Sequence, residues 1–181
     1  MIKHSETAIV INALMFASGA HAGIGQLRKY TNEPYIVHPI GVAELLSVYV
    51  PDVTEEMIAA ALLHDVVEDT KVSIELITSL FGNEVSQLVY ELTNKSSIND
   101  GNRATRARKD KEFLATVSAE AQTIKIADLI HNTSSITQFD QAFAEIYLKE
   151  KSLLLDVLIK ASPVILEVAR AQLNEHLKCF N

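Results

Sequence analysis

The sequence is poor in the residues that mark secreted, membrane and nucleic-acid-binding proteins. Its single cysteine, Cys179, permits no internal disulfide, which predicts a reducing compartment and therefore the cytoplasm. No apolar run approaches the roughly 18 residues of a membrane span, and the N-terminus lacks the basic-then-apolar order of a signal peptide. Sixteen Lys and Arg stand against 23 Asp and Glu, a net charge of −7. This charge argues against a general nucleic-acid binder, because phosphate backbones demand an excess of cations.

Glycine and proline are also scarce, with six and four in 181 residues, and no Pro/Gly/Ser-rich linker divides the chain. Abundant Ala, Leu, Ile and Glu favour helix over sheet, and a hydrophobic content of 48% suffices for one substantial core. We find no internal repeat and no convincing strand. The sequence therefore predicts an all-α protein in which residues 1–181 form a single domain.

Apolar spacing and capping residues predict where the helices lie. Two polar loops, 25–35 and 94–102, separate groups of helices, and a basic concentration follows at 103–111. Ser5, Asp52 or Thr54, Ser73 and Ser118 are the expected N-caps, and Phe81-Gly82 is expected to stop a helix. The expected helices cover residues 5–21, 39–49, 54–69, 73–80, 84–93, 118–132, 141–161 and 163–178.

One imidazole and three carboxylates stand together between Ala60 and Thr70, directly after an apolar run. On a helix, His64 would share a face with Glu68, and Asp65 with Asp69. Burying unpaired carboxylates is costly, so a bound cation is the expected explanation. Because adjacent residues on a helix point about 100° apart, His64 and Asp65 can hold one ion only if it lies between them or if the helix ends there.

Further ligands must come from elsewhere in the chain, and the candidates are His38 and Asp128. Each has an alternative: His38 as a structural histidine, and Asp128 as a buried acid paired with Lys125 or capped by Asn132. His21, like His131, is interpreted as supporting the site or as structural. A mixed shell of imidazole nitrogen and carboxylate oxygen suits Mn, Fe, Zn or a similar ion.

These residues carry a family resemblance. The order His38, His64-Asp65, Asp128 is similar to that of the HD-domain metal-dependent phosphohydrolases. Motifs spanning about residues 16–135 resemble more closely the hydrolase domain of the RelA/SpoT homologues. They are His21-Ala-Gly-Ile-Gly-Gln26-Leu-Arg28-Lys29, Pro34-Tyr35-Ile-Val-His38-Pro39, Leu63-His64-Asp65-Val-Val-Glu68-Asp69-Thr70, Phe81-Gly82 and Lys125-Ile-Ala-Asp128-Leu-Ile-His131-Asn132.

The resemblance implies a helical HD bundle with a metal site in its centre. Since 181 residues leave no room for synthetase or regulatory domains, the chain resembles a stand-alone small alarmone hydrolase. Such enzymes remove the 3′-pyrophosphate of ppGpp-type nucleotides, usually with Mn²⁺. The implied metal ligands are His38, His64, Asp65 and Asp128.

The resemblance also assigns residues to the reaction and the nucleotide. Glu68 and Asp69 match the pair that positions and deprotonates the attacking water. The implied nucleotide contacts are Arg28, Lys29, Asn132 and, by its place in the sequence, Tyr147. Arg103, in the basic cluster, either receives the diphosphates or belongs to an exposed helix face.

The sequence departs from the family pattern at two places where the base should bind, Tyr30–Glu33 and the Thr-Ser-Ser after Asn132. The choice between ppGpp and its adenosine analogue ppApp therefore stays open. One alternative is an HD phosphatase that releases one phosphate from NADPH or another nucleotide. Another is a nucleotide-binding module without catalysis, which Glu68 and Asp69 argue against because mere binding has no use for them. The expected partner is a small nucleotide, not nucleic acid or a membrane, and homo-oligomer formation is left open.

Overall fold

The computed structural model describes residues 6–178, so the predicted N-cap Ser5 and the lone Cys179 lie outside the described part. The chain divides into two compact units, Met1–Thr93 and Asn94–Asn181. The all-α prediction is confirmed: residues 6–178 contain helices and no β-strand, apart from one isolated antiparallel bridge between Leu27 and Pro34. That all 181 residues form one domain stays a prediction.

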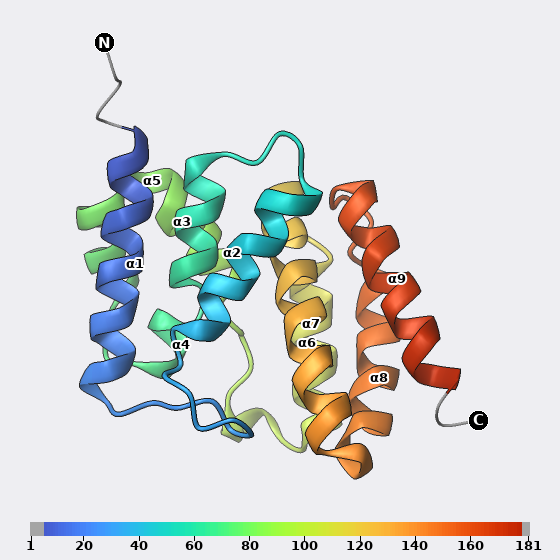
Figure 1. Cartoon of the computed structure of the whole chain (residues 1–181). Coiled ribbons are helices and arrows are strands. Elements are labelled where there is room, and N and C mark those ends of the chain that lie inside the picture. Colours follow the sequence, from blue (N-terminus) through green and yellow to red (C-terminus); the bar gives the residue numbers. More distant parts are fainter. Residues whose placement is uncertain (1–5, 179–181) are drawn as a thin grey trace. The chain divides into compact units, whose positions relative to one another are not determined.

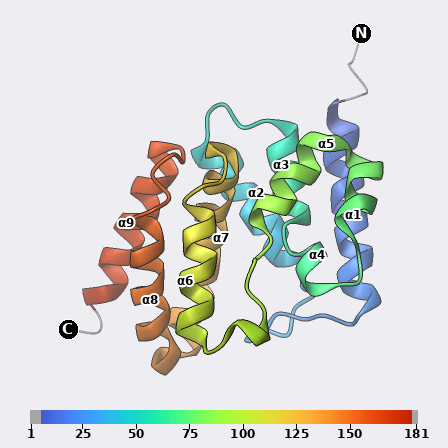
Figure 2. The same ribbon diagram turned by 180° about the vertical axis from the view of Figure 1, so that it is seen from behind.

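The first unit is built around α3 (Figure 1, blue to green). Met57 and residues 59–63 of α3 are all buried, as expected of a helix that is apolar on every side. α3 packs against α1, α2 and α5, with α2 and α5 on opposite sides of it in Figures 1 and 2. The helices of this unit are α1 (Glu6–Gly23), α2 (Val37–Tyr49), α3 (Glu55–Leu63), α4 (Val66–Asp69) and α5 (Ile74–Leu92).

Capping hydrogen bonds set the helix starts in this unit. Thr54, rather than Asp52, caps α3, since its hydroxyl accepts from the Met57 amide at 3.2 Å. Ser73 caps α5 in the same way through the Leu76 amide. The predicted stop at Phe81-Gly82 is confirmed as a break within α5, where Gly82 has φ 84° and ψ 174°. That backbone conformation is essentially restricted to glycine.

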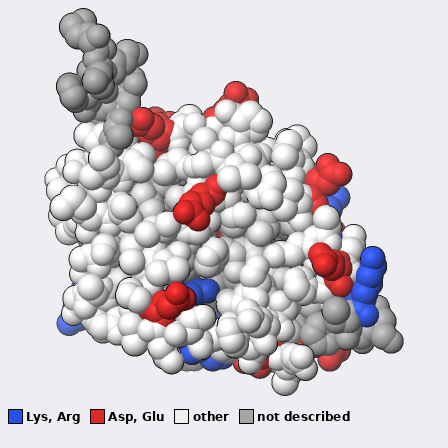
Figure 3. Space-filling model, in the orientation of Figure 1, with Lys and Arg blue, Asp and Glu red and all other residues white. Residues whose placement is uncertain are grey.

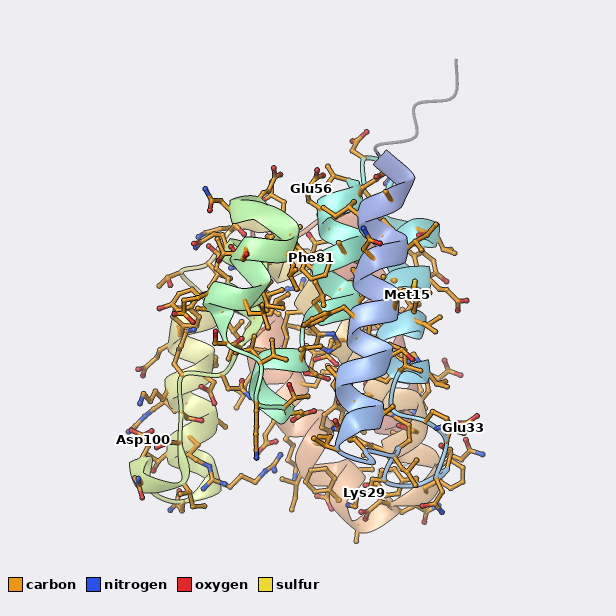
Figure 4. All side chains as sticks on the ribbon, turned by 90° about the vertical axis from the view of Figure 1, so that its left-hand side faces the viewer. Met15, Lys29, Glu33, Glu56, Phe81 and Asp100 are labelled. Carbon is orange, nitrogen blue, oxygen red and sulfur yellow. The ribbon has the colours of Figure 1, made fainter. Side chains whose placement is uncertain are left out.

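Both α5 and the loop after α1 lie close to α1. Phe81 reaches from α5 to α1, and its ring meets Phe16 edge-on with centroids 5.6 Å apart (Figure 4). Met15, on the same helix as Phe16, is 69% exposed. Lys29 and Glu33 mark the loop of residues 24–36, which connects α1 to α2 (Figure 4).

The second unit is built on α7, α8 and α9, which pack against one another. The basic cluster, whose secondary structure the sequence left open, forms α6. The elements are η1 (Ile98–Asp100), α6 (Arg103–Leu114), α7 (Ala119–Phe139), α8 (Gln141–Leu155) and α9 (Pro163–Leu177). Ser118 caps α7 as predicted, through the Ala121 amide at 3.1 Å.

The helix expected over 141–161 ends earlier, at Leu155. The backbone beyond it is bound to side chains of α7 instead. The Lys160 amide donates to Gln122 Oε1, and the Ser162 amide donates to Thr123 Oγ1, both at 2.9 Å. Tertiary hydrogen bonds therefore replace the helical ones that the apolar spacing suggested.

Lys151 is buried in this unit with only 1% of its surface exposed. Its ammonium donates to Thr133 Oγ1 at 2.9 Å and to Gln172 Oε1 at 2.7 Å. Burial lowers the pKa of Lys151 to about 7, and the charge of Asp128 opposes that shift. A buried lysine with these neighbours is a source of pH-dependent stability.

Between residues 6 and 178, none of the helices combines the length and hydropathy needed to cross a bilayer. On the face shown in Figure 3, acidic side chains are scattered, and several lie beside Lys or Arg side chains.

Candidate metal and active site

Three of the four predicted metal ligands come together in the first unit. His38, His64 and Asp65 each offer one ligand atom, and these atoms lie within 4.8 Å of one another. Asp65 Oδ2 lies 3.0 Å from His64 Nε2 and 3.7 Å from His38 Nε2. Both histidines are buried, at 1% exposure for His38 and 4% for His64, whereas Asp65 is partly exposed. The cluster therefore has a buried imidazole side and an open carboxylate side.

The backbone fixes the tautomer of His64. Its Nδ1 lies 2.7 Å from the carbonyl oxygen of Ala61, which can only accept, so Nδ1 carries the proton. In the neutral ring, Nε2 is then an unprotonated nitrogen facing Asp65. This is the arrangement found in metal-binding histidines, whose other nitrogen donates to a carbonyl or carboxylate.

A helix ends directly before His64 and Asp65. The sequence predicted that a helix ends around residues 64–69; α3 ends at Leu63, and a separate turn, α4, begins at Val66. Asp65 lies between the two with φ −96° and ψ −7°. The sequence analysis allowed His64 and Asp65 to hold one ion either on a continuous helix, with the ion between their directions, or at a helix end. The structure has the helix end.

Tyr35 holds the carboxylate of this cluster. Its hydroxyl donates to Asp65 Oδ2 at 2.5 Å, a short, charge-assisted hydrogen bond. The Tyr35 ring packs against His21 and His38, at centroid distances of 4.7 and 5.8 Å. A residue of the loop after α1 thus orients an oxygen predicted to bind metal.

The predicted catalytic pair, Glu68 and Asp69, lies on α4, and both side chains are exposed. The Asp69 amide donates to the Asp65 carbonyl at 2.9 Å, so the backbone makes one helical turn between the two aspartates. Residues four apart on such a turn share a face. Asp69 also accepts a hydrogen bond from Gln26 Nε2 at 2.7 Å.

The predicted nucleotide contacts Arg28 and Lys29 lie on the loop after α1, in the same unit as the cluster. The Arg28 guanidinium lies 5.8 Å from the centroid of the Tyr35 ring. The Lys29 ammonium lies 4.7 Å from the Tyr30 ring centroid and donates to the Tyr30 hydroxyl at 3.1 Å. Cations are attracted to the faces of aromatic rings, so these contacts help to hold the two side chains. Their contact with a nucleotide stays a prediction.

Asp128, the fourth predicted ligand, belongs to the second unit and is 5% exposed. Its Oδ2 accepts from Lys125 Nζ at 2.8 Å, and its Oδ1 accepts from Asn132 Nδ2 at 2.6 Å. The contacts of the alternative interpretation, a paired and capped acid, are thus present. Its role as a ligand stays a prediction, as does the nucleotide contact of Asn132.

The remaining predicted nucleotide contacts also lie in the second unit. Tyr147 is half-buried on α8, and its hydroxyl donates to the Leu129 carbonyl at 3.3 Å. Arg103 forms a two-pronged ion pair with Glu150, at 2.8 and 2.5 Å, which raises the pKa of the guanidinium. It also lies 4.8 Å from the Phe143 ring centroid. Lys109, from the same basic cluster, pairs with Asp100 at 2.8 Å.

Sequence reasoning gave no role to two residues that contact the site, Gln26 and Tyr35. Both lie inside motifs that carried the family resemblance, and membership of those motifs was the one feature of the sequence that could have pointed to a role for them. Neither follows a helical or strand period, so spacing alone could not show that they reach residues 43 and 30 positions away.

The donor set fits a divalent transition ion. Nitrogen and oxygen ligands bind such ions at about 2.0–2.2 Å, so two ligand atoms of one ion lie roughly 3–3.6 Å apart. The 3.0 Å distance lies within that range and the 3.7 Å distance just above it, and the fixed tautomer of His64 leaves a nitrogen able to coordinate. Three ligands also leave coordination positions for a further carboxylate and for solvent.

A helical unit with two buried histidines and an adjacent aspartate defines an HD-type metal site. The sequence model described as HD domain matches residues 13–149, and the chain belongs to the HD-domain family. Among its relatives is the guanosine-3′,5′-bis(diphosphate) 3′-pyrophosphohydrolase MESH1 of Danio rerio, 36% identical over 135 residues. The match covers 74% of this chain and 72% of the MESH1 chain, and it confirms the resemblance seen in the motifs.

Longer proteins match over the same part. A GTP pyrophosphokinase of Myxococcus xanthus is 36% identical over 139 residues, but the match covers 74% of this chain and only 18% of that protein. A Synechocystis relative, 40% identical over 131 residues, is covered over 17% of its length. A solved structure of a metazoan SpoT orthologue, described as hydrolysing ppGpp, matches with a TM-score of 0.82, 30% identity and 96% coverage of both chains.

Proposed function

We propose that the protein is a metal-dependent pyrophosphohydrolase that removes the 3′-pyrophosphate of (p)ppGpp-type nucleotides or of the adenosine analogue. The observation that carries the proposal is the buried pair of imidazole nitrogens beside the Asp65 carboxylate, with the tautomer of His64 fixed by the Ala61 carbonyl. The stand-alone relative of similar length supports the substrate class, since its name describes that reaction.

In this proposal His38, His64, Asp65 and Asp128 hold the ion, with Mn²⁺ as the expected metal and another divalent transition metal as the alternative. A bound ion of this kind lowers the pKa of water and offsets negative charge on a phosphoryl group. The burial of Asp128 on α7 supports its inclusion, because a buried carboxylate needs compensating charge, and a metal ion would add to that supplied by Lys125.

Glu68 and Asp69 are proposed to orient the attacking water and accept its proton. Water attacks the phosphorus atom that is bonded to the ribose 3′ oxygen, and the bond between that phosphorus and the 3′ oxygen breaks. The 3′ oxygen then takes a proton, which leaves the nucleoside 5′-di- or triphosphate and pyrophosphate. Exposed carboxylates one helical turn from a metal ligand suit this role, since they are accessible to solvent and substrate.

Arg28 and Lys29 are proposed to contact the nucleotide and its phosphates, with Asn132 and Tyr147 at the sugar or base. Arg103 is proposed to receive a diphosphate, in exchange for its ion pair with Glu150. The proposed setting is the cytoplasm, with a small nucleotide rather than nucleic acid or a membrane as the partner. Self-association is left to measurement.

The experiment is to incubate the purified chain with ppGpp and with ppApp, in Mn²⁺ and in EDTA, and to separate the products by anion exchange. Metal-dependent release of pyrophosphate is expected, and the ratio of the two rates gives the base preference. Release of orthophosphate, or cleavage of NADPH instead, would move the protein to the phosphatases of the HD family. No cleavage of either alarmone with metal bound would overturn the proposal.

Two variants divide the site into its parts. Asp65→Ala is expected to lose metal binding and activity together, because it removes a ligand. Glu68→Ala is expected to keep the metal and lose turnover by roughly 100-fold or more, the usual contribution of a general base. Glu84→Ala, an exposed acid on α5, serves as the control with unchanged activity. Near-normal turnover in Glu68→Ala would show that its assigned role is wrong.

A further inference from the structure

A chain of hydrogen bonds runs from a buried histidine to the proposed catalytic pair. His21 Nδ1 lies 2.6 Å from Gln26 Oε1, and Gln26 Nε2 lies 2.7 Å from Asp69 Oδ2. His21 is 1% exposed, Gln26 is half-buried and Asp69 is exposed. The chain therefore leads from the interior of the first unit to a carboxylate at its surface.

The charge of Asp69 fixes every donor and acceptor in this chain. An ionised carboxylate only accepts, so Gln26 must turn its NH₂ group towards Asp69. The amide carbonyl of Gln26 then faces His21, and His21 must donate through Nδ1. The amide orientation and the imidazole tautomer are thus both set by one exposed carboxylate.

The backbone of Gln26 is held as firmly as its side chain. Its amide donates to the His21 carbonyl at 3.0 Å, and its carbonyl accepts from the Tyr35 amide at 3.2 Å. The turn between His21 and Gln26 contains Gly25 at φ 65°, a conformation that glycine adopts without strain. A side chain anchored at both ends can hold Asp69 in one rotamer.

The hydrogen bonds of His21 leave one of its ring nitrogens unused. Its Nε2 is buried without a hydrogen-bond partner, and a buried unsatisfied nitrogen destabilises a fold. The side-chain hydrogen bond that His21 makes through Nδ1 points, through Gln26, towards a proposed catalytic group, which fits a functional role.

We propose that Gln26, backed by His21, is a positioning residue that orients the Asp69 carboxylate for its work on the attacking water. This inference rests on the proposed function, in which Asp69 is one of the catalytic pair. Gln26 does not touch the reacting atoms; it acts through Asp69. The loop after α1 then serves the site twice, orienting Asp65 through Tyr35 and Asp69 through Gln26.

A double-mutant cycle separates this role from a structural one. Gln26→Met keeps the shape of the side chain and removes both hydrogen bonds, and it is expected to lower kcat about tenfold or more with KM within about twofold. Combined with Asp69→Ala, it is expected to cause no further loss, because its target is gone. Gln87→Met is the matched control, since it removes a 3.0 Å amide-to-carboxylate bond to Glu91 on α5.

A loss of the same factor in both backgrounds would overturn the proposal, because Gln26 would then act independently of Asp69. Unchanged kcat in Gln26→Met would overturn it as well. The cycle is run on ppGpp, or on whichever phosphoester the metal-loaded protein cleaves.

A second readout needs no activity at all. In ¹⁵N-histidine NMR spectra recorded at about pH 8.5, where ordinary imidazoles are neutral, His21 is expected to show the Nδ1-protonated tautomer. Comparison with His21→Phe assigns its signals. Gln26→Met and Asp69→Ala are expected to change that tautomer, whereas Gln87→Met is not. An unchanged His21 tautomer in both variants would overturn the chain, even if alarmone cleavage were confirmed. Conversely, if the NMR spectra change as expected but ppGpp is not cleaved, the proposed function is wrong and the hydrogen-bond chain from His21 to Asp69 stands.

Discussion

The hydroxyl of Tyr35 offers a direct test of how the metal site is built. Tyr35→Phe removes the hydroxyl that donates the 2.5 Å hydrogen bond to Asp65 and keeps the ring. The ring can keep its contacts with His21 and His38 and its place beneath Arg28. Any change in metal binding then reports on the orientation of Asp65.

The structure sets the size of the effect. A hydrogen bond to a charged group contributes roughly 1.5–3 kcal/mol, which corresponds to a factor of about 10–100 in a binding constant. The Tyr35–Asp65 hydrogen bond is already present before the metal binds, so its full energy does not enter the metal affinity. Only its effect on the orientation of the Asp65 carboxylate does. We therefore expect Mn²⁺ affinity to fall about tenfold, the lower end of the range for residues that hold metal ligands.

Competition with a fluorescent Mn²⁺ chelator measures the affinity directly. Tyr30→Phe is the matched control, because it removes a phenol hydroxyl that accepts from Lys29 at 3.1 Å on the same loop. It is expected to leave Mn²⁺ affinity within about twofold of the unaltered protein. Equal or higher affinity in Tyr35→Phe would refute the claim that this hydroxyl prepares Asp65 for metal.

Three further predictions concern stability and substrate binding. The folded-state pKa of Lys151, about 7, lies below its ordinary value of 10.5, so the unfolded chain binds more protons between these values and stability rises with pH there. Denaturant unfolding should show a rise of up to about 1.4 kcal/mol per pH unit above pH 7 that Lys151→Met lacks. Gly82→Ala should cost about 1–3 kcal/mol because alanine is strained at φ 84°, whereas Gly19→Ala, inside α1 with open space around it, should stabilise by about 0.5–1 kcal/mol. Arg103→Gln should raise KM for ppGpp and leave kcat unchanged, if Arg103 exchanges Glu150 for a diphosphate.

Each of these has an outcome that contradicts it. Parallel pH curves for the original chain and Lys151→Met would show that the buried lysine does not control stability in this range. Equal unfolding energies for Gly82→Ala and Gly19→Ala would mean that the break in α5 carries no backbone strain. An unchanged KM in Arg103→Gln would leave Arg103 as the structural partner of Glu150.

Much of the helical framework could be predicted from the sequence because its signals are local. The hydroxyls of Thr54, Ser73 and Ser118 each accept from an amide three residues ahead. Such caps can be predicted because Ser and Thr are preferred at the N-terminus of a helix. Gly82 broke a helix where the Phe-Gly pair predicted it. The end of α8 could not be predicted, since the competing bonds to Gln122 and Thr123 involve another helix.

The candidate site likewise has features that the sequence indicated and features that it could not. The order of His38, His64, Asp65 and Asp128 along the chain, with Glu68 and Asp69, carried the family resemblance that implied a metal-dependent hydrolase. Residue type and spacing alone left structural alternatives open for His38 and Asp128.

Tertiary structure alone decided how the first three of these predicted ligands meet and what holds them. It ended α3 at Leu63, set the tautomer of His64 through Ala61, and brought Tyr35 and Gln26 to carboxylates 30 and 43 residues away. It also buried Lys151, a residue that composition would place at the surface. Hydrogen bonds between distant residues follow no period in sequence, so only the folded chain could specify them.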